Sequence, residues 1–227
     1  MQNPILDPGQ LAARIDHTLL KADATARDIA QLCAEARQHG FWSVCVNSSR
    51  VALASHLLDD SGVRITGVAG FPLGAMSGDA KRIEIEAAID DGAHEIDVVM
   101  NLGRFKDGDD TFVLRELRDL VEAADERPVK VILETCLLTC EEKIRACRLA
   151  VESGAQFVKT STGFAMGGAT VEDVRLMRET VGPDFGVKAS GGIRDTPTAL
   201  AMIAAGATRL GASASVAIVK GFAQKEV

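Results

Sequence analysis

One short apolar segment of the chain carries a lysine and leads directly into small hydroxyl residues and a glycine. Residues 156–163 read Gln-Phe-Val-Lys-Thr-Ser-Thr-Gly, with the lysine at position 159. Strands buried in parallel sheets consist mainly of Val, Ile and Leu, so a lysine there needs an explanation. A lone lysine of this kind usually forms an ion pair or reaches solvent at the strand end. The alternative is a desolvated amine that attacks a carbonyl carbon.

A second segment repeats this pattern. Residues 185–192 read Phe-Gly-Val-Lys-Ala-Ser-Gly-Gly and place Lys188 near the end of another strand-like run. Two ammonium groups that face one interior repel each other, and this repulsion lowers the proton affinity of one of them, as a nucleophilic amine requires. The pair favours covalent chemistry, although the residue types alone do not decide whether Lys159 or Lys188 is the nucleophile.

Two aspartates are candidate partners for these lysines. Asp97 lies between Ile96 and Val98 in an apolar run, where it could serve only as a structural counter-charge. A carboxylate that balances a buried ammonium can also transfer protons, so the structural and catalytic interpretations merge beside two lysines. Asp16 lies in the first expected strand, next to the eighth around a barrel, and is a candidate second counter-charge for Lys188.

Glycine-rich turns follow the last two expected strands. Gly191 and Gly192 come after the Lys188 segment, and Gly211 and Ser213 come after the final strand. Barrel enzymes often bind phosphate at the loops after strands seven and eight, through backbone N–H groups and a helix N-terminus. Gly163 is a further candidate backbone donor. Arg194 is a candidate for ligand contact, with a solvated loop position as the alternative.

The elements that must position these residues alternate between helix and strand along the whole chain. Strand-like runs begin near residues 15, 42, 64, 95, 128, 156, 185 and 208, and helical patterns separate them. Eight such units in 227 residues predict a single-domain (β/α)8 barrel over residues 1–227, with an extra N-terminal helix at residues 6–14. An open doubly wound sheet is the alternative. In the barrel, Asp97, Lys159 and Lys188 fall on strands four, six and seven.

Composition excludes several functional classes. The net charge of −7 argues against a nucleic-acid or anionic-membrane surface, so a phosphate would need a local binding device. The five cysteines include no Cys-x-x-Cys pair, and the four histidines lack zinc-ligand spacing. No apolar run reaches membrane length, and the N-terminal residues lack a secretion signal. These features favour a cytoplasmic protein that uses no metal.

Three other features favour structural roles. Cys45 is expected to be a small buried hydrophobe. His17 has no evident cysteine or serine partner, so we interpret it as structural. Residues 71–74, Phe-Pro-Leu-Gly, are expected to form a loop wall.

Together these segments resemble deoxyribose-phosphate aldolase, a family of class I aldolases. The matching segments are residues 15–20, 70–74, 95–101, 157–164, 188–194 and 209–213. The pair Lys-Thr-Ser-Thr-Gly and Lys-Ala-Ser-Gly-Gly-Ile is the specific part of this resemblance. It implies a barrel that cleaves 2-deoxy-D-ribose 5-phosphate to glyceraldehyde 3-phosphate and acetaldehyde, without metal or other cofactor. A homodimer or a homotetramer is compatible with it.

The resemblance also implies roles for individual residues. Lys159 would form the Schiff base, Lys188 would be the neighbouring lysine that perturbs it, and Asp97 would donate and accept protons. Apart from the resemblance, Asp16 and Thr162 are expected to be supporting residues.

Two positions depart from the pattern. Some members carry a lysine where this chain has Phe164, so one positive charge on the phosphate side is missing. Some members also end in a tyrosine thought to reach the site, whereas this chain contains no tyrosine. Two other functions remain open from the residues: a phosphate-binding isomerase or epimerase without a covalent step, and a non-catalytic sugar-phosphate sensor.

Overall fold

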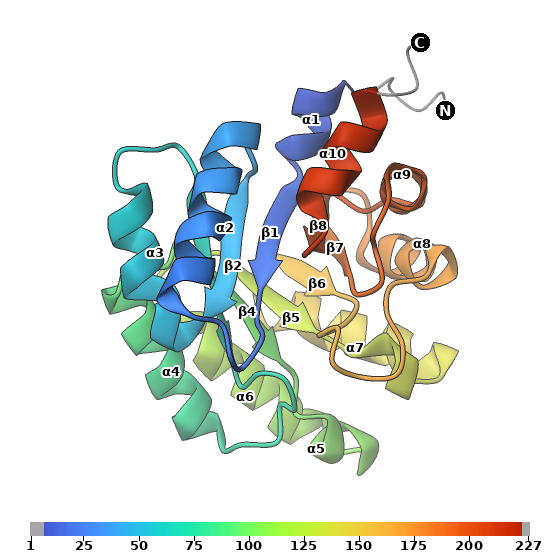
Figure 1. Ribbon diagram of the computed structural model, residues 1–227. Coiled ribbons are helices and arrows are strands. Elements are labelled where there is room, and N and C mark those ends of the chain that lie inside the picture. Colours follow the sequence, from blue (N-terminus) through green and yellow to red (C-terminus); the bar gives the residue numbers. More distant parts are fainter. Residues whose placement is uncertain (1–6, 224–227) are drawn as a thin grey trace.

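The computed structural model describes residues 7–223, which form a closed barrel of eight parallel strands surrounded by helices (Figure 1). The strands follow one another around the barrel in chain order, and β1 pairs with β8 to close it. The strands are β1 Ile15–Leu19, β2 Ser43–Asn47, β3 Arg64–Ala69, β4 Glu95–Val99, β5 Val129–Ile132, β6 Phe157–Lys159, β7 Gly186–Ser190 and β8 Arg209–Ala212. The predicted (β/α)8 barrel is confirmed, and the alternative open sheet is wrong.

Helices lie in the connections between strands, and two further helices flank the barrel sequence. The connecting helices are α2 Ala26–His39, α3 Val51–Leu58, α4 Gly78–Asp90, α5 Leu102–Lys106, α6 Asp110–Ala123, α7 Cys140–Glu152, α8 Val171–Val181 and α9 Thr196–Ala204. The expected extra helix is α1 (Pro8–Ala12), which packs beside the last helix, α10 (Ser215–Ala223) (Figure 1). Residue 6 and the residues after 223 lie outside the described part, so the structure does not test the predictions for them.

Local sequence explains where many helices begin and end. Thr25 and Asp28 form a capping box at the start of α2, and Thr139 and Glu142 form another at the start of α7. Each box satisfies backbone N–H groups that the first helical turn leaves without partners. The Gly-Ala steps that join helix to strand begin with left-handed glycines at Gly92 (φ 103°), Gly154 (φ 87°) and Gly206 (φ 113°).

Two connections differ from the sequence prediction. The fifth strand was expected over residues 128–135 but ends at Ile132, because the chain then turns into the 3-10 helix η2 (Thr135–Leu137). The short helix α5 was not expected. Asn101 caps it by accepting a hydrogen bond from the backbone N–H of Arg104 at 3.2 Å.

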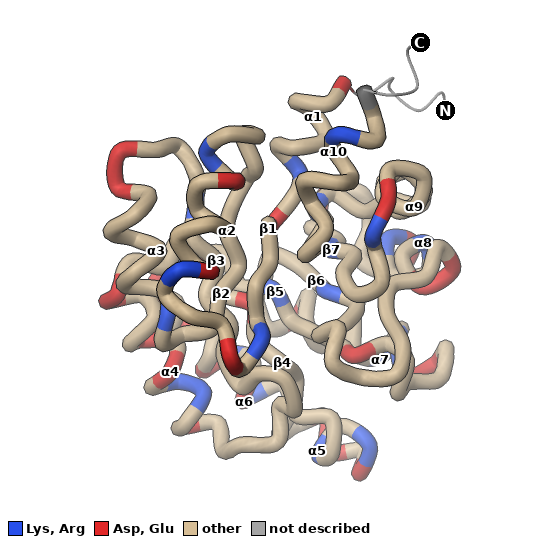
Figure 2. The backbone as a smooth tube through the Cα atoms, viewed as in Figure 1, with Lys and Arg blue, Asp and Glu red and all other residues tan. Residues whose placement is uncertain are grey.

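The strand register brings charged residues into the barrel interior. Lys159 is paired with Ile132 on one side and Lys188 on the other, and Asp97 is paired with Lys130. Figure 2 shows basic positions on strands inside the ring of helices as well as on the outer helices. Among residues 7–223, no helix combines the length and the apolar character needed to cross a membrane.

Candidate active site

A cavity of about 280 Å³ opens where the strands of the barrel end. It is lined by Lys159 and by residues 18–21, 162–164, 190–194 and 211–213. A larger surface hollow of about 750 Å³ lies between α4 and α6, but none of the strand lysines lines it. The smaller cavity is therefore the candidate site, because a reactive amine must be reached by substrate.

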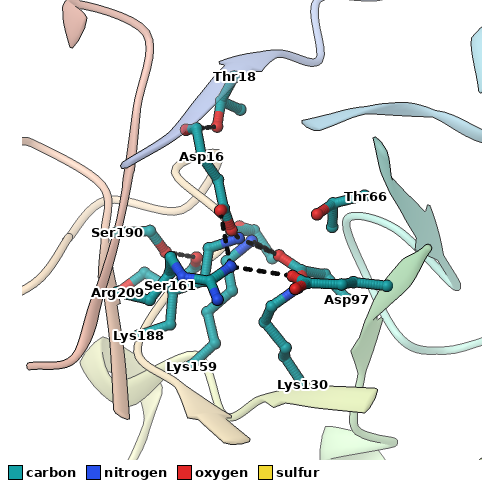
Figure 3. Close-up of polar contacts among 12 residues, drawn as sticks. Asp16, Thr18, Thr66, Asp97, Lys130, Lys159, Ser161, Lys188, Ser190 and Arg209 are labelled. Atoms are coloured by element: carbon teal, nitrogen blue, oxygen red, sulfur yellow. Dashed lines mark hydrogen bonds and ion pairs between the residues drawn. The ribbon is translucent and has the colours of Figure 1, made fainter. Parts of the chain in front are cut away.

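Asp97 lies at the centre of the buried charges beneath this cavity. Its Oδ1 is 2.8 Å from the Nζ of Lys130, and its Oδ2 is 2.8 Å from Lys159 and 2.7 Å from Lys188. Figure 3 shows the three lysines pointing toward this one carboxylate. Burial alone would raise the pKa of Asp97, but the three ammonium groups hold it well below its ordinary value.

Lys188 is enclosed more completely than Lys159. Its side chain is fully buried, and its Nζ contacts the carboxylates of both Asp16 and Asp97. Burial would lower the pKa of Lys188, but the two carboxylates outweigh it and raise the pKa above the ordinary value. Lys188 is therefore an ammonium ion at neutral pH. Lys159 contacts one carboxylate and lines the cavity, so the geometry distinguishes two lysines that the sequence could not.

The carboxylates and cations in the barrel interior form a closed ring of ion pairs. Lys130 contacts Glu95 at 2.7 Å and Asp97 at 2.8 Å, and Lys188 contacts Asp97 at 2.7 Å and also contacts Asp16. Arg209 closes the ring through contacts of 2.9 Å with both Asp16 and Glu95. All six side chains are buried. The prediction that Asp16 is a second counter-charge for Lys188 agrees with this geometry.

The ring is electrically balanced without Lys159. Three carboxylates alternate with three cations around it, and the amine of Lys159 attaches to Asp97 as a fourth cation. Removing the proton of any ring cation would leave three buried carboxylates with only two ring cations, and such an unbalanced buried charge is costly. The amine of Lys159 can lose its proton with the six ring charges still paired.

Sequence reasoning missed three members of the ring. Lys130 lies in an apolar run just as Lys159 and Lys188 do, so the same signal could have identified it. Glu95 and Arg209 are the first residues of β4 and β8, and their pairing joins residues 114 positions apart. No short-range pattern reveals such a contact.

The glycine loops after β6 and β7 line the same cavity. Gly163, Gly191 and Gly192 have φ values of 84°, 86° and 81°, a region that other residues rarely adopt. Among residues 7–223, the N–H groups of these glycines donate to no protein acceptor. Such loops can offer backbone donors to an anion.

The last strand differs slightly from the prediction. Gly211 lies within β8 instead of the loop that follows, and a Cβ at this position would be 3.1 Å from Cε of Lys188. Gly211 therefore makes room for the buried lysine as well as lining the cavity. Ser213 and Arg194 are exposed at the cavity, as is Lys21 from the β1–α2 loop, which sequence analysis missed.

Phe164 lines the cavity, and Phe71 packs against it. The rings of Phe71 and Phe164 meet edge to face with centroids 5.3 Å apart, and Nζ of Lys159 is 6.0 Å from the Phe71 ring. Phe164 is 56% exposed, so the position contributes apolar surface instead of a charge. Residues 71–74, which were expected to form a loop wall, are not among the residues that line the cavity, and Phe71 lies beside it through its contact with Phe164.

Two further residues singled out in the sequence, Cys45 and His17, lie on β2 and β1. Cys45 is buried, and burial raises the pKa of its thiol, in agreement with a packing role. His17 does have a serine partner, contrary to the prediction: its Nδ1 is 3.0 Å from Oγ of Ser215 at the start of α10. Its Nε2 is 2.8 Å from Glu35. The sequence could not reveal this contact, because 198 positions separate His17 from Ser215.

Thr162 lines the cavity and contacts Glu134, a residue between β5 and η2 that sequence analysis also missed. Within the described part of the chain, no group of three or more His, Cys, Asp or Glu side chains could hold a metal ion.

A parallel (β/α)8 barrel in which a strand lysine lines a small pocket at the strand ends and contacts a buried carboxylate beneath it has the architecture of a Schiff-base-forming aldolase. The chain belongs to the DeoC/LacD family of aldolases, whose model matches residues 11–223.

Similar proteins support this assignment over nearly the whole chain. The chain is 60% identical over 210 residues to the deoxyribose-phosphate aldolase of Alkaliphilus oremlandii, covering 92% of this chain and 95% of that protein. It is 56% identical over 215 residues to the enzyme of the same name from Thermococcus gammatolerans, covering 93% and 96%. The tetrameric deoxyribose phosphate aldolase of Aeropyrum pernix superimposes with a TM-score of 0.91 at 34% identity, covering 96% and 93%.

Proposed function

We propose that this aldolase reversibly cleaves 2-deoxy-D-ribose 5-phosphate to D-glyceraldehyde 3-phosphate and acetaldehyde, through an imine on Lys159. The observation that carries this proposal is the position of Lys159: among the four interior cations, only its amine lines the cavity and lies outside the balanced ring. The names of the relatives support the choice of substrate.

The reaction begins with attack of the Lys159 amine on the aldehyde carbon C1. Loss of water from the carbinolamine gives a protonated imine, which is an electron sink. Removal of the proton from the C3 hydroxyl then breaks the C2–C3 bond and releases glyceraldehyde 3-phosphate. The electron pair of that bond passes into an enamine, which is protonated at C2. Hydrolysis of the resulting imine releases acetaldehyde and restores the amine.

Asp97 relays protons during these steps. Its Oδ2 is 2.8 Å from Nζ of Lys159, so it contacts the reacting nitrogen directly. Because its pKa lies well below the ordinary value, Asp97 holds a proton only briefly before passing it to water or substrate. Lys188 acts as a fixed positive charge that keeps Asp97 ionised.

The phosphate group is assigned to the glycine loops at the cavity. Backbone N–H groups of Gly163, Gly191 and Gly192 provide donors, and Ser213 adds a hydroxyl. Arg194 lines the same cavity and contributes a local positive charge. The protein needs such a charge to bind phosphate, because its net charge of −7 would otherwise repel the anion.

The test is borohydride reduction in the presence of acetaldehyde, followed by peptide mass mapping. We expect an ethyl group on the peptide that contains Lys159, and we expect Lys159→Ala to abolish both labelling and cleavage. Label on Lys188 would reverse the assigned roles. An unlabelled but active enzyme would favour an isomerase or epimerase without a covalent step.

The remaining proposals concern the whole protein. We place it in the cytoplasm as one domain spanning residues 1–227, with five reduced cysteines, as the free thiols of the described residues suggest. A homodimer or homotetramer is supported by the tetrameric relative from Aeropyrum pernix. Light scattering at several protein concentrations measures the assembly.

A further inference from the structure

Glu134 lies next to the cavity in a backbone conformation that is unusual for its type. Its φ and ψ are 52° and 62°, in the left-handed region, and the residue is 3% exposed. The other non-glycine residues of the described chain with positive φ are Asp125 and Glu126, in an exposed turn after α6. A strained conformation at a buried position is stabilised by its surroundings and is most common at functional sites.

The carboxylate of Glu134 holds the turn that follows Lys159. Both of its oxygens are 3.3 Å from the backbone nitrogen of Thr162, and Oε2 accepts a short hydrogen bond from the Thr162 hydroxyl. That hydroxyl in turn accepts a hydrogen bond of 3.1 Å from the N–H of Phe164. One carboxylate therefore organises three consecutive residues, 162–164, which all line the cavity.

This carboxylate has no ionic partner among residues 7–223, where no lysine, arginine or histidine nitrogen lies within 4.0 Å of it. A buried carboxylate without a counter-charge is costly unless several hydrogen bonds satisfy it. Packing alone would favour an apolar residue at this position. The three donor contacts from Thr162 are the compensation that the structure provides.

The turn held by Glu134 abuts the loop assigned to the phosphate. A Cβ at Gly163 would lie 3.9 Å from Cα of Gly191, and one at Gly191 would lie 3.6 Å from Cα of Gly163. Movement of residues 162–164 would therefore displace the glycine donors at positions 163 and 191 together.

The geometry points to Glu134 as a positioning residue that fixes the turn at residues 162–164 and, through it, the phosphate side of the cavity. This inference rests on the proposed function for its substrate. Glu134 needs no contact with the reacting atoms, since Thr162 transmits its effect. The N–H of Thr162 donates to Glu134 and that of Phe164 donates to the Thr162 hydroxyl, which leaves the N–H of Gly163 to bind the substrate.

The first experiment compares Glu134→Gln, Thr162→Val and the double variant. Each single change should raise KM for 2-deoxyribose 5-phosphate by roughly tenfold, because a charge-assisted hydrogen bond is lost, while KM for unphosphorylated 2-deoxyribose changes less than about twofold. The double variant should have the same KM as each single variant, since each single change already removes the hydrogen bond between the Thr162 hydroxyl and the Glu134 carboxylate. Thr162→Ser keeps the hydroxyl, so its KM for 2-deoxyribose 5-phosphate should stay close to that of the wild type. Glu126→Gln is the matched control: a glutamate with positive φ on the exposed turn.

The second experiment is independent of catalysis. Hydrogen–deuterium exchange at the amides of Thr162 and Phe164 should become at least ~10-fold faster in Glu134→Gln and Thr162→Val, with Glu126→Gln unchanged. If the wild type fails to cleave the sugar phosphate, the proposed function is wrong, but this exchange still tests whether Glu134 fixes the turn at residues 162–164. If the wild type cleaves it, equal KM increases for both sugars or unaltered exchange in Glu134→Gln overturns the positioning role.

Discussion

At the scale of single residues, the difference between Lys159 and Lys188 comes from the number of carboxylates around each amine. Lys188 contacts two and is sealed from the cavity, whereas Lys159 contacts one and faces it. Mutual repulsion alone, the argument available from the sequence, treats the two lysines alike. The buried carboxylates separate a permanent ammonium ion from an amine that can react.

The charge of Lys188 is testable through Asp97. In Lys188→Met the positive charge is lost, and the carboxylates of Asp16 and Asp97 lose a partner. Asp97 then stabilises the protonated amine of Lys159 more strongly, so imine trapping with acetaldehyde and borohydride should shift to more alkaline pH. The measurement is the pH dependence of single-turnover trapping.

A second substitution at Lys188 separates the effect of charge from that of shape. Lys188→Arg should keep more of the wild-type curve if charge is what matters, allowing for the different shape of the guanidinium. A Lys188→Met curve that stays in place while turnover is lost would contradict the electrostatic role. Lys188 would then act in a later proton transfer.

At the scale of elements, the loop after β8 should discriminate between phosphorylated and unphosphorylated substrates. Ser213 is exposed at the cavity, beside the glycine loops. Ser213→Asp should raise KM for 2-deoxyribose 5-phosphate by about tenfold or more through charge repulsion, with a much smaller change for 2-deoxyribose. Ser213→Asn is the uncharged control. Equal losses for both sugars in Ser213→Asp would mean that the loop has only a structural role.

A second element-scale prediction concerns a buried ion pair on the outer layer. Lys81 of α4 donates to Glu116 of α6 at 3.1 Å and to the carbonyl of Val99 at 2.9 Å. Burial lowers the pKa of Lys81 and raises that of Glu116, so here desolvation outweighs attraction. Lys81→Met should lower the free energy of unfolding by about 3 kcal/mol, because Glu116 is left buried without its partner.

The double variant tests this explanation. Lys81→Met with Glu116→Leu should recover most of the stability, since a well-packed apolar pair avoids desolvation. Urea denaturation measures both variants, and Lys220→Met on the exposed side of α10 is the control. No recovery in the double variant would mean that α4 and α6 need the ion pair itself.

Local sequence predicted the barrel well because its signals are short-range. Capping boxes at Thr25 and Thr139, glycine helix stops and apolar strands each involve a few neighbouring residues. The site was predicted only in part. Lys130 carried the same signal as the other strand lysines, but Glu134 could not be found this way, since its partner Thr162 is 28 positions away.

At the scale of the whole molecule, the barrel interior beneath the cavity is ionic instead of apolar. The ring joins five strands, β1, β4, β5, β7 and β8, and Lys159 adds β6 to it. Figure 3 shows how the lysines and Arg209 converge from different strands on the carboxylates of Asp16 and Asp97. Closure of the barrel and formation of the site are therefore one event: each ring charge finds its partners only when the strands are in register.

This coupling predicts how stability depends on pH. Lys188 and Arg209 hold the pKa of Asp16 below its ordinary value against the effect of burial, and the pKa of Asp97 is lowered in the same way. These carboxylates contribute stability above the pKa of an unfolded aspartate, about 4, and lose it as the pH falls toward the folded values. Lys188 has a raised pKa, so its contribution is complete below about pH 10 and is lost above it.

The free energy of unfolding should therefore fall steeply below about pH 4 and again above about pH 10. Asp16→Asn should flatten the acid limb, because one strongly shifted carboxylate no longer takes up a proton on unfolding, and it should lower stability at neutral pH by leaving Lys188 and Arg209 with one partner fewer. Urea denaturation from pH 3 to pH 11 measures both limbs.

Asp23→Asn, at an exposed position in the β1–α2 loop, should leave the profile unchanged. An acid limb of the same slope in Asp16→Asn would mean that carboxylates outside the ring govern acid unfolding, and the barrel would then close without help from its interior charges.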